Sequence, residues 1–303
     1  MSQNTTPATI AEKIQHMEKF LDLEKFINGD KNDPKDIESY YKTNHAAYRR
    51  VHSKAGFMHF HVSKDGKTFS PEDASYQPDV AAQFIKSGDR VLELGSGQGA
   101  NILHLAKKFP DVTFDGLDLF PGKMAEELPN LTITKQDYTQ MPQFADNTFD
   151  VIYAIETLVH CSDKLKVLAE IKRVLKPGGI FVVFDYALKN AYESYDRENQ
   201  LAVSLISKGG AAALIESVAE WEDFFAKTGF AAVSKKDLTE PIMPDLRRLE
   251  HRAACILDHP FRAKVVFKTL PNQFVSNIIL GYLGADSAAE GAIVYKEWVL
   301  KKD

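Results

Sequence analysis

The segment 91–99, VLELGSGQG, joins a short apolar run to three alternating glycines, Gly95, Gly97 and Gly99. The apolar run predicts a buried strand, and residues 100–109 follow with apolar side chains at helical spacing. Glycine lacks a Cβ, so its backbone can adopt positive φ angles and pass close to a ligand. A strand, a glycine turn and a helix in this order predict a nucleotide-binding βα unit.

The residues after the glycines narrow the choice of ligand without fixing it. Gly95, Gly97 and Ala100 also fit the dinucleotide fingerprint, which tolerates Ala in its last place. The segment 112–119, VTFDGLDL, predicts a second strand with Asp118 near its end. A carboxylate there can accept both hydroxyls of a ribose, whether in NAD or in S-adenosylmethionine.

The rest of the chain predicts an α/β fold with one seven-stranded sheet. After the two strands above, further strands are expected at 131–134, 151–156, 180–186, 230–238 and 291–300. Strands that alternate with helical segments are typical of a parallel, doubly wound sheet.

Helical patterns fill the intervals between these strands. Helices are expected at 162–176, which ends in the turn KPGG, and at 221–228. An apolar stripe predicts one N-terminal helix from residue 10 to about Asn28. The insertions 187–218 and 241–285 are mostly helical in pattern. We expect the N-terminal segment and both insertions to form one lid over the carboxyl ends of the strands, where ligands bind in open α/β sheets.

These motifs, in this order, resemble the class I S-adenosylmethionine-dependent methyltransferases. The resemblance covers residues 88–186 and includes the FDVI segment at 149–152 and the VLKPGG segment at 174–179. It implies a Rossmann-like methyltransferase sheet whose last two strands form an antiparallel edge. It also implies S-adenosylmethionine as cofactor, with S-adenosylhomocysteine as product. In the family, Asp118 matches the acid that binds the ribose, Asp137 matches the acid beside the adenine, and Glu93 supports the methionine end. The cofactor contacts implied in this way are Glu93, Gly95, Ser96, Gly97, Gly99, Asp118, Leu119, Asp137, Tyr138 and Ala154.

A narrower resemblance concerns the fourth strand. The segment 153–156, YAIE, together with His160, is similar to a signature of sterol and related isoprenoid C-methyltransferases, although TLV at 157–159 departs from that signature. The aromatic segment 40–61 is similar to one that precedes the glycine motif in the same subgroup, without its full glycine-tryptophan signature. These similarities imply a small, apolar, isoprenoid-like acceptor and C-methylation.

Two residues are the candidates for the chemistry. Glu156 closes an apolar strand, where an unpaired carboxylate is costly, so it has either a partner or a catalytic role. If the acceptor is an alkene, methyl transfer produces a carbocation that a carboxylate can stabilise and deprotonate. A structural hydrogen bond is the alternative for Glu156. His160 lies near the methyl donor in the family, and a purely structural histidine is its alternative.

Aromatic and basic residues outside these motifs are candidates for the acceptor pocket. Aromatic faces attract a sulfonium ion or a carbocation, so some of these rings are expected to face the ligand. The expected pocket residues are Tyr40, Tyr41, His59, Tyr186 and Tyr192. Arg247, Arg248 and Arg252 can bind a diphosphate or can equally be solvated. His45, His52, His59 and His61 form a histidine group with no carboxylates or cysteines at ligand spacing, so no catalytic metal is expected.

Composition bounds the partners and the compartment. The 303 residues carry a net charge of −5 and no long run of Lys or Arg, which argues against nucleic-acid binding. Only two cysteines are present, there is no apolar run of membrane-spanning length, and no secretory signal is recognised. These features favour a cytoplasmic protein that acts on a small molecule without stable membrane insertion, with a homodimer left open. Three parts are expected: a helical lid at 1–75, a cofactor-binding core at 76–186, and acceptor-pocket insertions with closing strands at 187–303.

Three alternatives remain at this point. The same scaffold can methylate oxygen or nitrogen of a small metabolite, with His160 or Glu156 as the base. An NAD(P)-binding oxidoreductase fits the glycines and Asp118, but it does not explain the turn at 176–179 or the closing strand at 291–300. A non-catalytic cofactor-binding protein explains the glycine motif but not Glu156.

Overall fold

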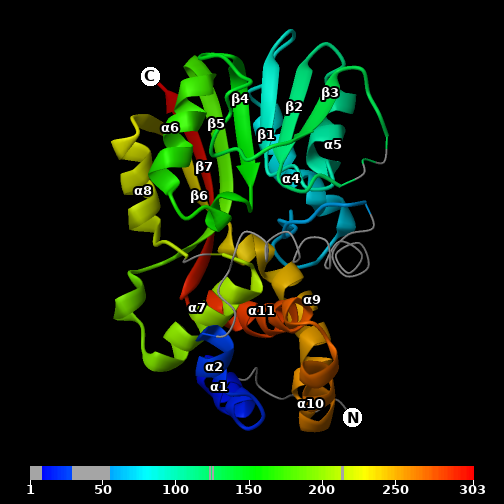
Figure 1. The fold of residues 1–303 in the computed structure, drawn as a ribbon, viewed down its shortest axis with the longest axis vertical. Coiled ribbons are helices and arrows are strands. Elements are labelled where there is room, and N and C mark those ends of the chain that lie inside the picture. Colours follow the sequence, from blue (N-terminus) through cyan, green and yellow to red (C-terminus); the bar gives the residue numbers. More distant parts are fainter. Residues whose placement is uncertain (1–8, 29–54, 123, 125, 213–214) are drawn as a thin grey trace.

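The structure is a computed structural model that describes residues 9–28, 55–122, 124, 126–212 and 215–303. It has two halves, a sheet flanked by helices and a group of helices below it (Figure 1). The strands are β1 (Arg90–Leu94), β2 (Thr113–Asp118), β3 (Leu131–Lys135), β4 (Phe149–Ile155), β5 (Leu175–Leu188), β6 (Phe230–Asp237) and β7 (Ile293–Lys302).

The sheet has the strand order β3-β2-β1-β4-β5-β7-β6. The first five strands of the chain pair in parallel, whereas β7 is antiparallel to both β5 and β6. The order reverses between β1 and β4, and open α/β sheets bind ligands at such a point. The seven-stranded α/β sheet with an antiparallel edge is therefore confirmed.

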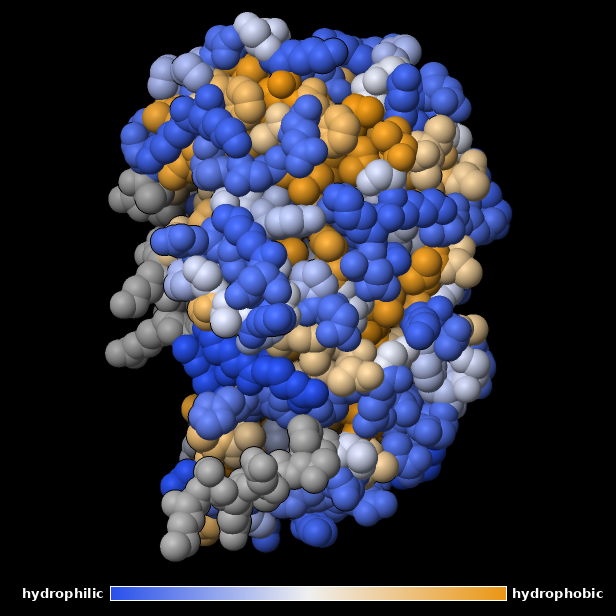
Figure 2. Space-filling model, turned by 180° about the vertical axis from the view of Figure 1, so that it is seen from behind, coloured by the Kyte–Doolittle hydropathy of each residue, from blue (hydrophilic) through white to orange (hydrophobic). Residues whose placement is uncertain are grey.

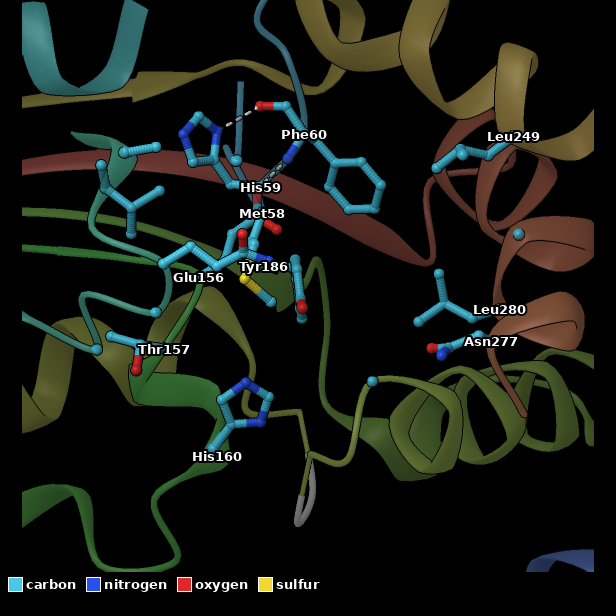
Figure 3. Close-up of a pocket in the computed structure, with 18 of the residues that line it drawn as sticks. Met58, His59, Phe60, Glu156, Thr157, His160, Tyr186, Leu249, Asn277 and Leu280 are labelled. Carbon is cyan, nitrogen blue, oxygen red and sulfur yellow. Dashed lines mark hydrogen bonds between the residues drawn. The ribbon is translucent and has the colours of Figure 1, made fainter. Parts of the chain in front are cut away.

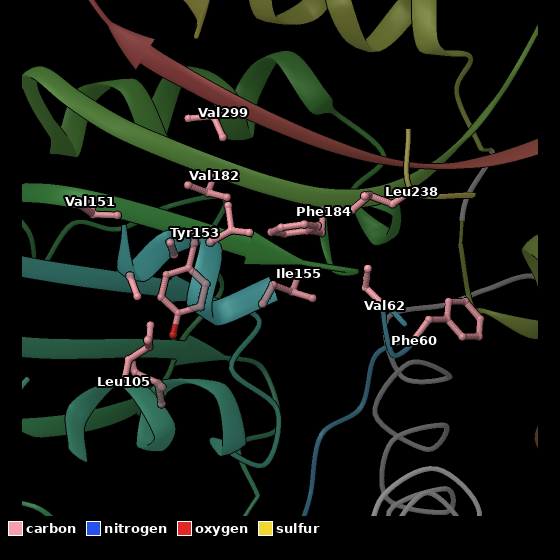
Figure 4. Packing of buried hydrophobic residues seen from close by; sticks show 14 of the residues in the cluster. Phe60, Val62, Leu105, Val151, Tyr153, Ile155, Val182, Phe184, Leu238 and Val299 are labelled. Atoms are coloured by element: carbon pink, nitrogen blue, oxygen red, sulfur yellow. The ribbon is translucent and has the colours of Figure 1, made fainter. Parts of the chain in front are cut away.

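Alternate residues of each strand enter two separate cores, because successive side chains point to opposite faces of a sheet. On one face, Val151, Tyr153 and Phe184 pack against Leu105 of helix α5 (Ala100–Lys108), and α4 (Tyr76–Ala82) covers the same face (Figure 4). On the other face, Ile152 packs with α6 (Lys164–Val174) and α8 (Val218–Lys227). Helices on both faces explain why the central strands β1 and β4 are almost continuously buried.

The lower half consists of helices from three distant parts of the chain (Figure 1). They are α1 (Ile10–Glu18), α2 (Leu23–Asn28), α7 (Arg197–Gly209), α9 (Thr239–Leu257), α10 (Pro260–Thr269) and α11 (Asn272–Ala289). They share a third apolar core. The chain therefore inserts three helices between its last two strands.

Two predicted helices have different bounds in the structure. The prediction of a single N-terminal helix was wrong, since α1 ends at Glu18 and α2 begins only at Leu23. The helix expected to reach Lys176 ends at Val174, and Leu175 already begins β5, so the KPGG segment is part of a strand. In the first case the apolar stripe continues through a turn, and periodicity alone does not show that the backbone direction changes.

The expected lid is only partly as predicted. Helices α9 and α11 and the segment 56–60 line the space below the strand ends, whereas α1 packs on the outer side of α7 and α11. Seen from behind, the surface is mostly hydrophilic, with hydrophobic residues showing mainly over the upper half (Figure 2). None of the helices in the described part of the chain has the length and apolarity needed to cross a bilayer.

Candidate functional site

The glycine turn after β1 brings bare backbone to the carboxyl end of the sheet. Gly95, Gly97 and Gly99 all have positive φ angles, of 67°, 52° and 77°. A Cβ on Gly95 would lie 2.1 Å from Thr157 Oγ1, so no larger residue fits there. The sequence needs glycine here both for the backbone conformation and for the close approach of the loop after β4.

Asp118 holds this turn from the end of β2. Its Oδ2 accepts the Gly97 amide at 2.8 Å, and its Oδ1 accepts the Phe120 amide at 2.7 Å. Both Asp118 and Gly97 line the cavity described below. The Asp118 side chain therefore fixes the backbone of the turn and also lies at the cavity where the sequence predicts a ligand.

Glu93 lies buried beneath the turn, on β1. Asn101 Nδ2 donates to its Oε1 at 3.2 Å. Burial raises the pKa of Glu93 to about 8. Asn101 Oδ1 lies 2.9 Å from Nε2 of His59, so one amide links this acid to the segment that precedes the sheet.

Glu156 leaves the end of β4 with an unusual backbone conformation. Its φ is 49°, in the left-handed region that residues other than glycine rarely adopt. Its amide donates to the Phe184 carbonyl at 2.7 Å. Its Oε1 accepts the Phe60 amide and the Tyr295 hydroxyl, both at 2.8 Å. Burial raises the pKa of Glu156 to about 8, against the lowering effect of these two donors. Such local strain at a buried acid is typical of functional sites.

His160 ends a short 3₁₀ helix, Leu158–His160, one turn beyond Glu156. Its Nδ1 lies 3.2 Å from the Ala211 carbonyl, which can only accept, so this contact assigns the ring proton to Nδ1 and the lone pair to Nε2. Burial lowers the pKa of His160, which favours the neutral ring. Buried Asp185 accepts the Val159 amide at 3.0 Å and so fixes the 3₁₀ helix that carries His160.

A cavity of about 640 Å³ joins these groups below the strand ends. Figure 3 shows Glu156 and His160 on one side of it, with Leu249, Asn277 and Leu280 of the helical half opposite. Met58, Phe60 and Tyr186 lie between them. One end of the cavity is thus the polar glycine turn, and the other is a largely apolar wall built by α9 and α11.

The predicted residues divide into those that line this cavity and those that do not. The lining includes Gly95, Ser96, Gly97, Asp118, Glu156, His160, His59 and Tyr186. Five others lie elsewhere. Leu119 is 38% exposed, and exposed Asp137 caps the Thr139 amide. Tyr138 donates to the Thr157 carbonyl at 2.8 Å, and Ala154 is buried in the sheet. The Tyr192 hydroxyl contacts Ser204 of α7 at 3.0 Å.

Gly99 and Glu93 support the turn from outside the cavity lining. Gly99 has a φ of 77°, which favours glycine, and a Cβ there would also meet the Ile133 side chain of β3. Tyr40 and Tyr41, together with His45 and His52, lie outside the described residues.

The histidine and arginine groups are largely accounted for by structural contacts. His61 stacks on Phe69 at 5.1 Å, and the described residues contain no group of three His, Cys, Asp or Glu side chains that could hold a metal ion. Arg247 pairs with Glu250 at 2.6 Å, and Arg248 pairs with Asp245 at 2.6 Å. Arg252 differs from both because it lines the cavity.

Sequence reasoning missed most of the helical wall. Leu249, Asn277 and Leu280 come from segments identified only as mostly helical, and no motif marked them. Arg252 was considered only as one of three arginines that can bind a diphosphate. Met58 and Phe60 belong to the aromatic segment 40–61 that the family resemblance singled out, and Phe60 is one of the aromatic residues that could be expected to line a pocket.

Known proteins with similar sequences or folds are methyltransferases or resemble them, which agrees with a cofactor site at the glycine turn. Residues 92–183 match the family described as "Methyltransferase domain". The chain carries a class I S-adenosylmethionine-dependent methyltransferase domain. A sterol 24-C-methyltransferase of Aspergillus fumigatus is 33% identical over 193 residues, which cover 60% of this chain and 51% of that protein. A cycloartenol-C-24-methyltransferase of Oryza sativa is 30% identical over 193 residues, covering 60% of this chain and 56% of that protein.

The chain thus spans about half the length of the curated relatives that it matches. Among solved structures, the cyclopropane synthase MmaA2 from Mycobacterium tuberculosis has a TM-score of 0.70 at 17% identity, covering 88% of this chain and 98% of that one. At that identity the likeness shows the fold alone. The sequence relatives place the methyltransferase domain near the sterol C-methyltransferases.

Proposed function

We propose that this chain transfers the methyl group of S-adenosylmethionine to a carbon of a small, apolar, isoprenoid-like acceptor, and that Glu156 accepts the proton released. One observation carries the proposal: a buried acid with a pKa of about 8 lies between a glycine turn and an apolar cavity wall. The relatives' names agree, since several are sterol C-methyltransferases.

The residues around the turn fit the cofactor. Ser96 Oγ lines the cavity side of the turn and is buried without a hydrogen-bond partner among the described residues, so it can receive a polar group of the cofactor. Glu93 supports the same turn from beneath. Asp118 lines the cavity where ribose hydroxyls are expected. When bound, S-adenosylmethionine supplies an electrophilic methyl group. The chain's own part is to bind, align and exclude water.

Residues that line the cavity can stabilise the positive charge that forms when an alkene acceptor is methylated. An alkene that gains a methyl group carries positive charge on the adjacent carbon until a proton leaves. The faces of Phe60 and Tyr186, whose ring centroids lie 6.3 Å apart, can stabilise that charge. Glu156 in its ionised form can take the proton. Its raised pKa means that it accepts a proton more readily than an exposed carboxylate does.

A second candidate function rests on His160. The hydrogen bond from Nδ1 to Ala211 leaves a neutral ring with its lone pair on Nε2, which suits a general base at neutral pH. A base of this kind could remove the proton from a hydroxyl or amine acceptor, which would make the protein an O- or N-methyltransferase.

Calorimetric titration tests the cofactor assignment first. We expect the wild-type chain to bind S-adenosylhomocysteine and not NADH. Asp118→Ala should weaken binding tenfold or more, because hydrogen bonds to a charged group contribute roughly 1.5–3 kcal/mol. Asp115→Ala is the matched control, since Asp115 also lies on β2 but pairs with Arg90 away from the cavity. Tight binding of NADH, or unchanged affinity in Asp118→Ala, would contradict this part of the proposal.

A further inference from the structure

Helix α10 exposes apolar side chains more than any other described segment. Six large hydrophobic side chains are exposed in the described part of the chain, and two of them lie on α10. They are Phe261 at 81% and Val265 at 45% exposure, and Leu270 at 40% follows directly after the helix. A single exposed apolar residue is ordinary, whereas a cluster on one short helix indicates an interaction surface.

The helix is two-sided. Phe261, Lys264, Val265 and Lys268 have the spacing i, i+3, i+4 and i+7, so they share one face. Ala263, on another face, is fully buried, and Phe267 contacts Phe20 with ring centroids 5.7 Å apart. The exposed face is therefore apolar and basic at once, while the inner face anchors α10 to the molecule.

The charge of this segment differs from that of the chain. Residues 259–271 contain Arg262, Lys264 and Lys268 and no acid, although the whole chain carries −5. Neither Lys264 nor Lys268 forms an ion pair with a described residue. The preceding acid, Asp258, accepts the Tyr282 hydroxyl at 2.6 Å.

We propose that the exposed face of α10 docks onto an anionic phospholipid surface. An aromatic and aliphatic stripe flanked by lysines matches the boundary between lipid headgroups and acyl chains, where long lysine side chains keep their charge in water. The complementary charge favours a membrane over a neutral protein partner or a second copy of this acidic chain.

The position of α10 relates the proposed docking to the cavity. Figure 1 shows α10 at the lower end of the helical half, away from the sheet. Ile256, four residues before the helix begins, and Phe274, five residues after it ends, both line the cavity. Segments on both sides of α10 thus reach the cavity that would receive a lipid acceptor. This consequence rests on the proposed function, whereas the docking itself does not.

Sedimentation with vesicles tests the docking without any catalysis. The full chain is mixed with phosphatidylcholine vesicles that either contain or lack phosphatidylserine. We expect binding that requires phosphatidylserine and weakens with added salt. Phe261→Ser should lower the partition coefficient about tenfold. Lys264→Glu combined with Lys268→Glu should lower it about twentyfold or more, at roughly fivefold for each lysine.

The matched control is Leu165→Ser combined with Lys166→Glu on α6, where an exposed leucine also adjoins an exposed lysine. This control should bind vesicles like the wild type. Melting temperature and S-adenosylhomocysteine affinity should be unchanged in all variants, which separates lost docking from misfolding and from failure of the cofactor assignment. Docking is refuted if the wild type ignores phosphatidylserine, or if the α10 variants bind like the control. Self-association that Phe261→Ser abolishes, without vesicle binding, would assign this face to a second copy instead.

Discussion

If Glu156 is the base, as we propose, the Tyr295 hydroxyl that donates to it lowers its pKa, and removing that hydroxyl gives a measurable prediction. Tyr295 lies on β7, 139 residues from Glu156 in the sequence, and donates to Oε1 at 2.8 Å. Gln77 Nε2 donates to the same hydroxyl at 3.3 Å and to the Phe60 carbonyl at 2.6 Å, which keeps the tyrosine in place. We therefore expect Tyr295→Phe to leave the cavity shape intact and to remove one donor from the ionised carboxylate.

The size of the effect follows from the hydrogen bond. A bond to a charged group is worth roughly 1.5–3 kcal/mol, against about 1 kcal/mol for a bond to the neutral acid. The difference, roughly 0.5–2 kcal/mol, raises the pKa of Glu156 from about 8 by about one pH unit. A base acts when it is deprotonated, so the rising limb of kcat/KM should move to higher pH by the same amount. Activity at pH 7 should fall about tenfold and recover at high pH.

The assay is methyl transfer to an accepted substrate across the pH range, with Tyr76→Phe as the control. Tyr76 also donates to a carboxylate, that of Glu297 at 3.4 Å, but it does not line the cavity. The control should keep the wild-type profile. A uniform loss of activity at every pH in Tyr295→Phe would refute the reasoning, because a purely structural defect is not rescued by raising the pH.

Two further predictions concern the glycine turn. The pKa of Glu93 is raised from 4.5 to about 8, so its contribution to stability is complete below pH 4.5 and is lost as the pH rises towards 8. Glu93→Gln should therefore become more stable relative to wild type across that window, by up to about 5 kcal/mol, in urea unfolding at several pH values; a constant difference would contradict the raised pKa. Gly95→Ala should lower stability by at least roughly 1–3 kcal/mol, because its Cβ would meet Thr157 Oγ1 at 2.1 Å with φ at 67°; an unchanged melting temperature would contradict the close approach.

The sheet could be predicted from the sequence because each strand is marked by residues within or next to that strand. The apolar run before Gly95, the acid at the end of β2 and the polar turn before β4 each mark one strand, and the family resemblance supplied their order. The site at the strand ends followed for the same reason, since consecutive motifs converge where parallel strands end. Asp118, Glu156 and His160 do lie around one cavity.

The helical half could not be predicted in the same way. An apolar stripe shows that a helix is amphipathic, but not which partner it covers, so α1 was expected near the strand ends and packs against α7 and α11 instead. Leu249 and Asn277 face the cavity only because α9 and α11 cross below the sheet. The contact between Tyr295 and Glu156 depends on the closing strand, and no local pattern encodes it.

The most direct test of the central claim is product analysis with radiolabelled S-adenosylmethionine and a panel of isoprenoid and sterol alkenes. We expect the wild type to give a C-methylated alkene. Glu156→Gln should still bind S-adenosylhomocysteine, but should lose roughly 10²–10⁴ in product formation, or give alcohols and isomers from an undischarged cation. His160→Ala should keep the product pattern. Full activity of Glu156→Gln with unchanged products, or loss of activity confined to His160→Ala with a hydroxyl or amine acceptor, would contradict the account.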